Sequence, residues 1–574
     1  MNNKVVLLVS AAFTIMTLSA CGTAQNSIAS KEQITTLQKK SLSEKEIKKN
    51  SQARAELMVL ESKLADSELA ISSVASLAPR KAKRKLERSR FLSQMYSSNV
   101  PAIRNTENYA HLESNAIKRV KEHPVSTFSI DVDTGSYSNV RRVINSGSLP
   151  RKDAVRVEEL VNYFNYQYPE PDTKPFSVTT EIAPTPWNKN TYLLHVGIKA
   201  IDVSKNNIPA SNLVFLVDVS GSMQSENKLG LLKKSLKLLT KQLRKQDKIS
   251  LVVYAGASGV VLEPTDGNKT ATISRALDNL AAGGSTNGAA GIKLAYLMAE
   301  QAFIKNGVNR IILATDGDFN VGTVNFEALS DLITEKRKSG ISLTTLGFGS
   351  GNYNDHLMEQ LADKGNGNYQ YIDTLNEAQK VLVDEMSSTL QTVAKDVKLQ
   401  IEFNNSKVSE YRLIGYENRV LKREDFNNDK VDAGDIGAGH TVTALYEISL
   451  VGSKEQSVDE LRYNKKSNAL YKSTLNGELA FLKIRYKAPK QENSKLISYA
   501  LNAKTITKNI KNTSDRFRFS AAVAAFGQML KGGTYTKKYS YSDVLDMARN
   551  ARGKDNFGYR GEFIKLVNLV KSLS

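Results

Sequence analysis

Cysteine is almost absent from this sequence, since Cys21 is the only one among 574 residues. A single thiol excludes an intramolecular disulfide. Histidine is also scarce, with five residues in the chain. The sequence contains no HExxH motif, no Ser-His-Asp order around a nucleophile elbow, and no P-loop lysine in its glycine-rich segment GGSTNGAAG. These absences argue against a conventional hydrolase or nucleotide-binding enzyme.

Long hydrophobic runs are absent as well, apart from the apolar stretch Val5–Thr17 near the N-terminus. It is shorter than the about 20 residues of a membrane-spanning helix, so it predicts a secretory signal. The stretch ends in LSAC, which resembles a bacterial lipobox and implies cleavage after residue 20 and lipidation of Cys21. Gly22 resembles the outer-membrane sorting pattern of a cell with two membranes. We therefore expect a lipid-anchored protein of the bacterial cell envelope; the alternative is an ordinary signal peptide with an incidental cysteine.

Acidic charge falls short of basic charge, which leaves a formal net charge of +20. Part of this excess is local: Arg80–Arg90 holds seven basic residues and a single acid, Glu87. Such a segment can bind anionic lipid head groups at about 1 kcal/mol per charge, although a solvated linker helix is the favoured interpretation. Export and the lack of a recognisable nucleic-acid module argue against nucleic acid as a partner.

The pentapeptide Asp218-Val-Ser220-Gly-Ser222 follows directly after the apolar run Asn212–Val217. Its carboxylate and two hydroxyls alternate along a tight loop, so they can face one centre, and Gly221 lets the backbone bend there. Hard divalent cations such as Mg²⁺ prefer oxygen ligands at about 2.0–2.1 Å in near-octahedral geometry. The pentapeptide therefore predicts one wall of a divalent-metal site.

Two further segments complete the pattern. The glycine-rich loop Ala281–Gly291 offers Thr286, and the apolar run Arg310–Thr315 leads into Asp316 within the turn sequence TDGD. The three pieces together resemble the metal-ion-dependent adhesion site of von Willebrand factor type A (VWA) domains. The resemblance implies hydroxyl ligands from Ser220, Ser222 and Thr286, with Asp218 and Asp316 binding the ion directly or through water. Mg²⁺ is the expected cofactor, with Mn²⁺ or Ca²⁺ as alternatives.

The charge of such a site suggests how it would bind a partner. Only two of the implied ligands are charged, so a divalent cation is at most neutralised and an incoming carboxylate can still bind. The resemblance implies a non-enzymatic module whose protein partner supplies an Asp or Glu. Three alternatives stay open: turn residues that bind no metal, an envelope scaffold with a vestigial metal site, and a hydrolase that uses the metal as a Lewis acid.

The surrounding pattern predicts an open α/β fold. Short apolar runs predict strands at 212–217, 249–254, 310–315, 342–347 and 368–372. Leucines at helical spacing in Glu226–Arg244 predict an amphipathic helix. Alternating strands and helices favour a doubly wound parallel sheet, which binds ligands outside the carboxyl ends of its strands. The loop Gly349–His356 should reach that face, so Asn354, Asp355 and His356 either rim the site or, as favoured, form a polar turn with a helix cap.

Segments on both sides of this domain read as strands, which predicts that the α/β domain is inserted in a β-sandwich. Phe176–Ile182 and Tyr192–Ile198 precede it, and alternating apolar residues from Val397 to Phe403 follow it, as do Thr441–Ile448 and Leu479–Tyr486. Pairing between strands from the two sides is the test of this prediction.

The flanking sequences extend the resemblance. SIDVDTGSYSNVRR and RVEELVNYFNYQYPEP resemble the N-terminal segment of one group of bacterial VWA lipoproteins, whose C-terminal domain has no assigned activity. An apolar stripe between Ser514 and Gly532 predicts a C-terminal helix. The expected organisation is a signal peptide at 1–20, a polar and partly helical tether at 21–104, the VWA-associated segment at 105–175, β strands at 176–210, the VWA domain at 211–392, a β-rich module at 393–490 and a helical region at 491–574.

Overall fold

A computed structural model describes residues 106–130, 133–204, 207–317, 326–454, 456–459, 461 and 477–574. The chain divides into two units, Met1–Ala102 and Ile103–Ser574, and these residues belong to the second. The predicted signal peptide, Cys21 and the basic segment Arg80–Arg90 lie outside the described residues. No helix in the described part has both the length and the apolar character needed to cross a bilayer.

A six-stranded sheet forms the α/β domain, in the order β10-β9-β8-β5-β6-β7. Its strands are β5 (Ser211–Asp218), β6 (Lys248–Tyr254), β7 (Ser258–Asp266), β8 (Val308–Thr315), β9 (Ser342–Phe348) and β10 (Tyr369–Ile372). All eight residues of β5 are buried, as expected for a central strand covered on both faces. The predicted doubly wound sheet is confirmed, with one addition: β7 pairs antiparallel with β6 at the edge.

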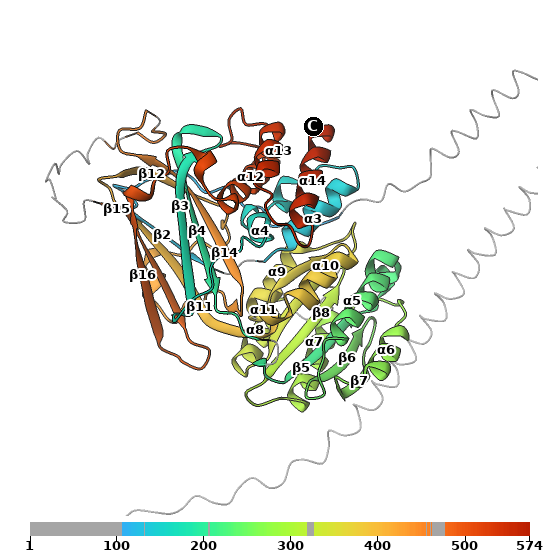
Figure 1. Ribbon diagram of the computed structural model, residues 1–574. Coiled ribbons are helices and arrows are strands. Elements are labelled where there is room, and N and C mark those ends of the chain that lie inside the picture. The colour runs from blue at the N-terminus through green and yellow to red at the C-terminus, as the bar shows by residue number, and fades with distance from the viewer. Residues whose placement is uncertain are drawn as a thin grey trace, which may run out of the picture. The chain divides into compact units, whose positions relative to one another are not determined.

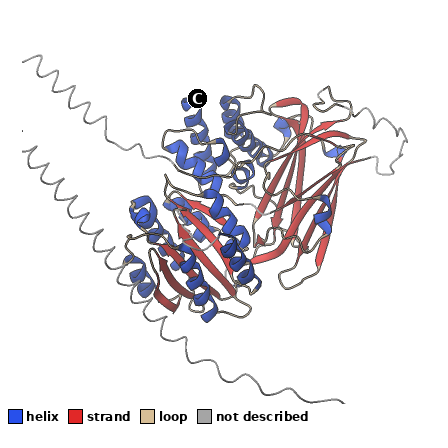
Figure 2. Cartoon of the chain, turned by 180° about the vertical axis from the view of Figure 1, so that it is seen from behind, coloured by secondary structure: helices blue, strands red, loops and turns tan. Residues whose placement is uncertain are grey.

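Helices cover both faces of this sheet (Figures 1 and 2). Side chains of β5 alternate between the faces, so Phe215 packs in a core with Leu236, whereas Leu216 packs in a second core with Ile292. The helices are α5 (Leu231–Thr240), α6 (Thr270–Asp278), α7 (Gly288–Gln301), α8 (Phe326–Lys338), α9 (Asp355–Lys364), α10 (Leu375–Gln379) and α11 (Met386–Leu390). A π-helical turn, Glu226–Gly230, precedes α5.

Two further sheets form a sandwich around one hydrophobic core. The first has the order β1-β12-β14-β4-β3, from β1 (Lys118–Arg119), β3 (Phe176–Thr185), β4 (Asn188–Ala200), β12 (Val408–Ile414) and β14 (Thr441–Leu450). The second has the order β13-β11-β15-β16, from β11 (Thr392–Phe403), β13 (Ile436–Gly437), β15 (Glu478–Lys487) and β16 (Ser494–Asn502), and β2 (Val125–Ser129) pairs with β11.

The sandwich is assembled from both sides of the α/β domain. β4 precedes that domain and pairs antiparallel with β14, which follows it, with Val196 opposite Ala444. The predicted insertion is therefore confirmed. One part of the predicted C-terminal organisation was wrong: the stretch 491–574 begins with strand β16, which pairs with β15, and its α-helices begin only at Asp515. The strand was missed because the outward-facing positions of this edge include the apolar Leu496, which blurs the alternation.

Helices from the two ends of the described chain share a single core. The N-terminal helices are α3 (Gly135–Asn145) and α4 (Val157–Asn162), and the C-terminal ones are α12 (Asp515–Leu530), α13 (Tyr541–Asn550) and α14 (Tyr559–Leu573). Phe164 contacts Phe519 and Phe563 edge-on. A Cβ on Gly527 would lie 3.3 Å from side-chain atoms of Val157 and Leu160, so this glycine allows α12 to approach α4 closely. In the sequence, the N-terminal and C-terminal helices are more than 300 residues apart.

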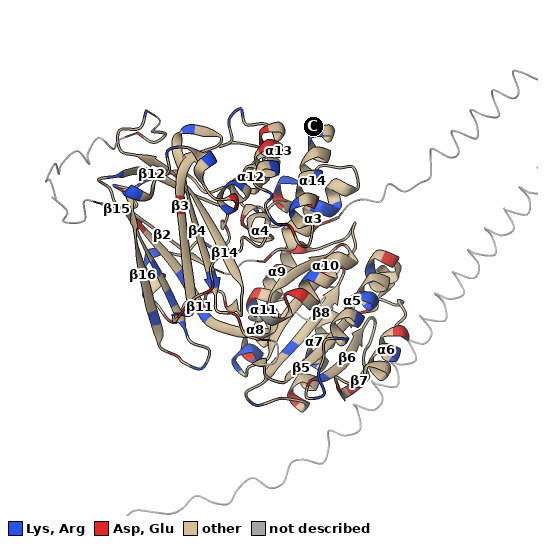
Figure 3. Cartoon of the chain, viewed as in Figure 1, with Lys and Arg blue, Asp and Glu red and all other residues tan. Residues whose placement is uncertain are grey.

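Lys and Arg residues are spread over strands and helices and are interspersed with acids (Figure 3).

Candidate metal-binding site

Asp218 is the last residue of β5 and is fully buried. Its Oδ1 accepts a hydrogen bond from the Ser220 amide at 2.9 Å. Its Oδ2 accepts from the hydroxyls of Thr315 at 2.8 Å and Tyr254 at 3.2 Å. Burial raises the pKa of Asp218, the bonds from Ser220 and Thr315 oppose this shift, and the charge of Asp316 adds to it. A cation beside the carboxylate would relieve this cost.

The two serine hydroxyls lie together beside Asp218. Ser220 Oγ and Ser222 Oγ are hydrogen-bonded to each other at 3.0 Å, because the chain turns into a 3₁₀ helix at Gly221–Gln224. Adjacent ligands of an octahedral Mg²⁺, each at about 2.0–2.1 Å, are separated by about 2.9 Å. The separation of the two hydroxyl oxygens therefore fits neighbouring positions around one ion.

The loop that carries Thr286 is joined to the Asp218 loop by two backbone hydrogen bonds. Gly221 N donates to Gly284 O at 3.0 Å, and Gly283 N donates to Val219 O at 2.8 Å. Among the described residues, the half-buried Thr286 hydroxyl has no hydrogen-bond partner. Tertiary structure thus brings this second motif segment to the first, with a hydroxyl available as a ligand.

Asp316 follows β8 and is fully buried. Its Oδ2 accepts hydrogen bonds from Lys228 Nζ at 2.7 Å and from Asn352 Nδ2 at 3.1 Å. Lys228 also donates to Asn352 Oδ1 at 2.9 Å. Gly349 leaves room for the lysine, because a Cβ there would lie 2.4 Å from Lys228 Cε. Sequence analysis missed both residues, since Lys228 reads as one lysine of an amphipathic helix.

The predicted rim is only partly where sequence analysis placed it. Asn354 caps α9 by accepting from Leu357 N at 3.3 Å, as the favoured interpretation predicted. Asp355 is buried and binds Arg156, so its placement at the rim was wrong. The first turn of α9 directs this carboxylate toward α4 instead. His356 is half-buried, and a role at the rim stays a prediction for it.

The donor set fits a hard divalent cation. The described residues contain no group of three or more His, Cys, Asp or Glu side chains that could hold a metal. The site instead combines two carboxylates with three hydroxyls, all of them oxygen donors. Asp218, Ser220, Ser222, Thr286 and Asp316 are the residues that would hold the ion, which would supply a Lewis-acidic position for a ligand oxygen.

The sheet and the residues at its carboxyl edge define a VWA domain. The family model described as von Willebrand factor type A domain matches residues 212–385, and a von Willebrand factor model matches residues 103–195. A third model, described as the C-terminal part of the uncharacterized protein YfbK, matches residues 388–573. VWA domains mediate protein–protein interactions, often in a metal-dependent way.

The particular family follows from full-length similarity. The chain is 50% identical over 477 residues to the uncharacterized protein YfbK of Escherichia coli K12, and the alignment covers 82% of each chain. The chain therefore belongs to the family of VWA-domain proteins that includes YfbK.

More distant similarities concern parts of the chain. The uncharacterized protein sll0103 of Synechocystis is 29% identical over 34% of this chain and 45% of its own length. Human inter-alpha-trypsin inhibitor heavy chain H3 is 23% identical over 44% of this chain and 30% of its own. The solved structure of a von Willebrand factor type A protein from Catenulispora acidiphila aligns over 69% of this chain and 91% of that chain, with 13% identity and a TM-score of 0.39. None of the models and relatives named here is described as an enzyme.

Proposed function

We propose that this protein is a lipid-anchored, non-catalytic binding protein of the bacterial cell envelope. In this proposal a divalent cation, Mg²⁺ first, is held by Asp218, Ser220, Ser222, Thr286 and Asp316. An Asp or Glu of a protein partner completes the coordination shell. The lipid on Cys21 attaches the protein to the membrane, and Arg80–Arg90 adds attraction to anionic head groups.

The spacing of the two serine hydroxyls carries the metal part of the proposal. Two oxygens 3.0 Å apart beside a buried carboxylate match adjacent ligands of one small cation. The burial of Asp218 and Asp316 supports it further, because two buried carboxylates repel each other unless positive charge lies between them. Partner binding follows as an expectation, because two carboxylates at most neutralise a divalent ion.

One observation favours a second candidate, a scaffold with a vestigial metal site. The ammonium of Lys228 already lies 2.7 Å from Asp316 Oδ2 and supplies positive charge there. In this alternative the flanking domains make the partner contacts, and the ion is dispensable.

Metal titration and partner capture separate the two candidates. Wild type and Asp218→Ala are titrated with Mg²⁺ and Mn²⁺ by calorimetry and are used to capture partners from an envelope extract with and without EDTA. Asp278→Ala is the matched control, because this aspartate is largely exposed on α6 and pairs with Lys237 rather than with the site. If partner binding depends on the metal, Asp218→Ala and EDTA should each abolish both metal binding and partner capture, while the control variant retains both.

Two other outcomes would support the alternative functions. A partner captured equally well by Asp218→Ala would support the scaffold. Metal-dependent turnover of an envelope substrate by the wild type would support a hydrolase instead. The anchor is tested separately by Cys21→Ser, which should release the protein from membranes under high salt, whereas continued membrane association would contradict lipidation as the attachment.

A further inference from the structure

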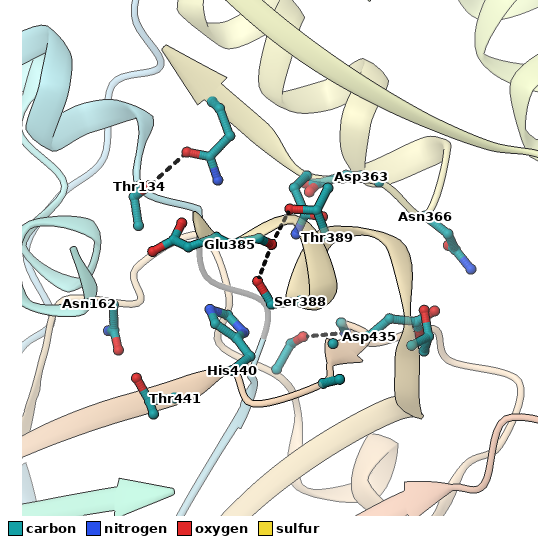
Figure 4. A pocket seen from close by; sticks show the side chains of 18 of the residues that line it. Thr134, Asn162, Asp363, Asn366, Glu385, Ser388, Thr389, Asp435, His440 and Thr441 are labelled. Atoms are coloured by element: carbon teal, nitrogen blue, oxygen red, sulfur yellow. Dashed lines mark hydrogen bonds between the residues drawn. The ribbon is translucent and has the colours of Figure 1, made fainter. Parts of the chain in front are cut away.

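A cavity of about 730 Å³ lies between the VWA domain and the neighbouring parts of the described chain. Figure 4 shows Asp363, Glu385 and Thr389 of the VWA domain around the same space as His440, which precedes β14, and Thr441, its first residue. Small-molecule sites commonly occur at domain junctions, with volumes of about 300–1,000 Å³. The cavity is therefore of a size and placement that suit a small ligand.

Arg310 supplies an unpartnered positive charge in the wall of this cavity. It is the third residue of β8 and its exposed fraction is only 4%. Nη1 donates to Thr344 Oγ1 at 2.5 Å, but the buried Nε has no hydrogen-bond partner. No carboxylate of the described residues lies within ion-pair distance of the guanidinium. Burial lowers the pKa of Arg310 to about 10, against the opposing charge of Asp435.

A buried guanidinium without an anionic partner destabilises the fold, because no interaction offsets the loss of its hydration. An anion from outside the chain would restore the missing charge-assisted hydrogen bonds. Arg310 therefore marks an anion subsite within the cavity.

The rest of the wall restricts which anion fits. Of the described side chains that line it, five are Lys or Arg and six are Asp or Glu, so the wall offers no excess of positive charge to a multiply charged anion such as phosphate. Asp363 is one of these acids, and its buried Oδ1 has no hydrogen-bond partner, although Arg419 binds its Oδ2 at 2.7 Å. Arg310, which has no carboxylate partner among the described residues, and Asp363, which has one oxygen without a hydrogen-bond partner, thus line the same cavity.

We infer that this cavity binds a small zwitterion of the amino-acid or short-peptide class, with its carboxylate on Arg310 and its ammonium received by Asp363. The site is separate from the metal centre. Arg310 lies near the start of β8 and Asp316 just beyond its end, six residues apart in sequence, which corresponds to about 20 Å along a strand.

Calorimetric titration with tri-L-alanine tests the inference on the full chain in detergent. The C-terminal amide of tri-L-alanine lacks the carboxylate, and N-acetyl-tri-L-alanine lacks the ammonium. Comparing these peptides therefore tests the contacts with Arg310 and Asp363 one at a time. We expect saturable binding of tri-L-alanine, at least tenfold weaker binding of the amide, weaker binding of the N-acetyl peptide, and no effect of EDTA. Insensitivity to EDTA keeps this result independent of the proposed metal-dependent function.

Three variants assign the contacts. Arg310→Met should weaken tri-L-alanine binding at least tenfold, and Asp363→Asn should remove the discrimination against the N-acetyl peptide. Arg337→Met is the matched control, because Arg337 lines the same cavity but already pairs with Asp432 at 2.6 Å; its binding should stay within threefold of wild type. Arg310→Met should keep the wild-type circular dichroism and melting temperature, since Met fills similar space without a buried charge.

Several results would overturn the inference. Equal affinity for the free peptide and its amide, or unchanged binding by Arg310→Met, would contradict it. So would tighter binding of inorganic phosphate than of tri-L-alanine. The inference also fails if no saturable binding occurs up to about 10 mM peptide, which corresponds to a binding free energy weaker than about −3 kcal/mol. Loss of structure in Arg310→Met would also count against it, because it would show that the guanidinium is needed by the fold itself.

Discussion

Arg156 joins the N-terminal segment to the VWA domain through a buried ion-pair network. Its exposed fraction is 1%, and its Nη1 and Nη2 bind Asp355 of α9 at 2.5 and 3.2 Å. Its Nε binds Glu159, and Tyr369 donates to the same Asp355 at 2.5 Å. Burial disfavours the charged guanidinium, but Asp355 and Glu159 raise the pKa of Arg156 well above its usual value. Arg156→Met therefore leaves two buried carboxylates without their cation.

Breaking a buried pair from one side costs about 3–5 kcal/mol. That loss corresponds to about two to four powers of ten in the folding equilibrium, at about 1.4 kcal/mol per factor of ten. In urea unfolding followed by circular dichroism, the transition that includes the VWA domain should shift down by about 1 M or more, given slopes of about 1–3 kcal/mol/M.

Two further variants test the energetic role of the Arg156 network. Lys336→Met breaks the partly exposed surface pair with Glu300 and should cost about 0–1 kcal/mol. Adding Asp355→Asn to Arg156→Met neutralises one orphaned carboxylate and should recover part of the loss. A loss below about 1 kcal/mol for Arg156→Met, or a double variant less stable than the single one, would refute the account of the network as a charge-balanced link.

Three other changes have defined outcomes. Lys228→Met removes the ammonium beside Asp316, so calorimetry should show Mg²⁺ binding several-fold tighter; weaker binding would mean that the lysine holds Asp316 in place for the metal. Burial, reinforced by Glu417, raises the pKa of Glu158 from 4.5 to about 8, so the folded state binds the extra proton and wild type should lose stability as pH rises through about 5–8. Glu158→Gln should flatten that part of the melting-temperature profile, and an unchanged slope would contradict the assignment. Ser514 caps α12 by accepting from Phe517 N at 3.3 Å, so Ser514→Ala should lower unfolding free energy by about 1–2 kcal/mol, and an unchanged urea midpoint would contradict the cap.

Much of the fold could be predicted from local pattern. Apolar runs such as Asn212–Val217 identify strands because buried parallel strands need side chains that are apolar on both faces. The cap at Ser514 and the stop near Gly532 identify α12 because helix ends have local hydrogen-bonding needs. The edge strands β7 and β16 were missed, because each is partly exposed and lacks a clear apolar signature.

In the candidate metal site, too, some residues could be predicted from the sequence and others are evident only in the tertiary structure. The sequence alone predicted that Asp218, Ser220 and Ser222 would form one wall of a metal site, since their spacing places three oxygens along a single turn. It also indicated Asp316, which follows β8 at the carboxyl edge of the parallel sheet, and Thr286, which lies in the glycine-rich loop before α7. Tertiary structure alone decided that Lys228 and Asn352 contact Asp316, because those contacts join segments 88 and 36 residues away.

Tertiary structure also decided which acids lie away from the site. Asp355 follows a strand of the same sheet and looks in sequence like a residue of the metal face, yet it is bound to Arg156 almost 200 residues earlier. Sequence spacing determines where a side chain enters a turn or a helix. Which cation a buried carboxylate faces depends on how distant segments pack. For this protein, that packing separates the predicted metal ligands from the ion pair that holds the VWA domain to its neighbours.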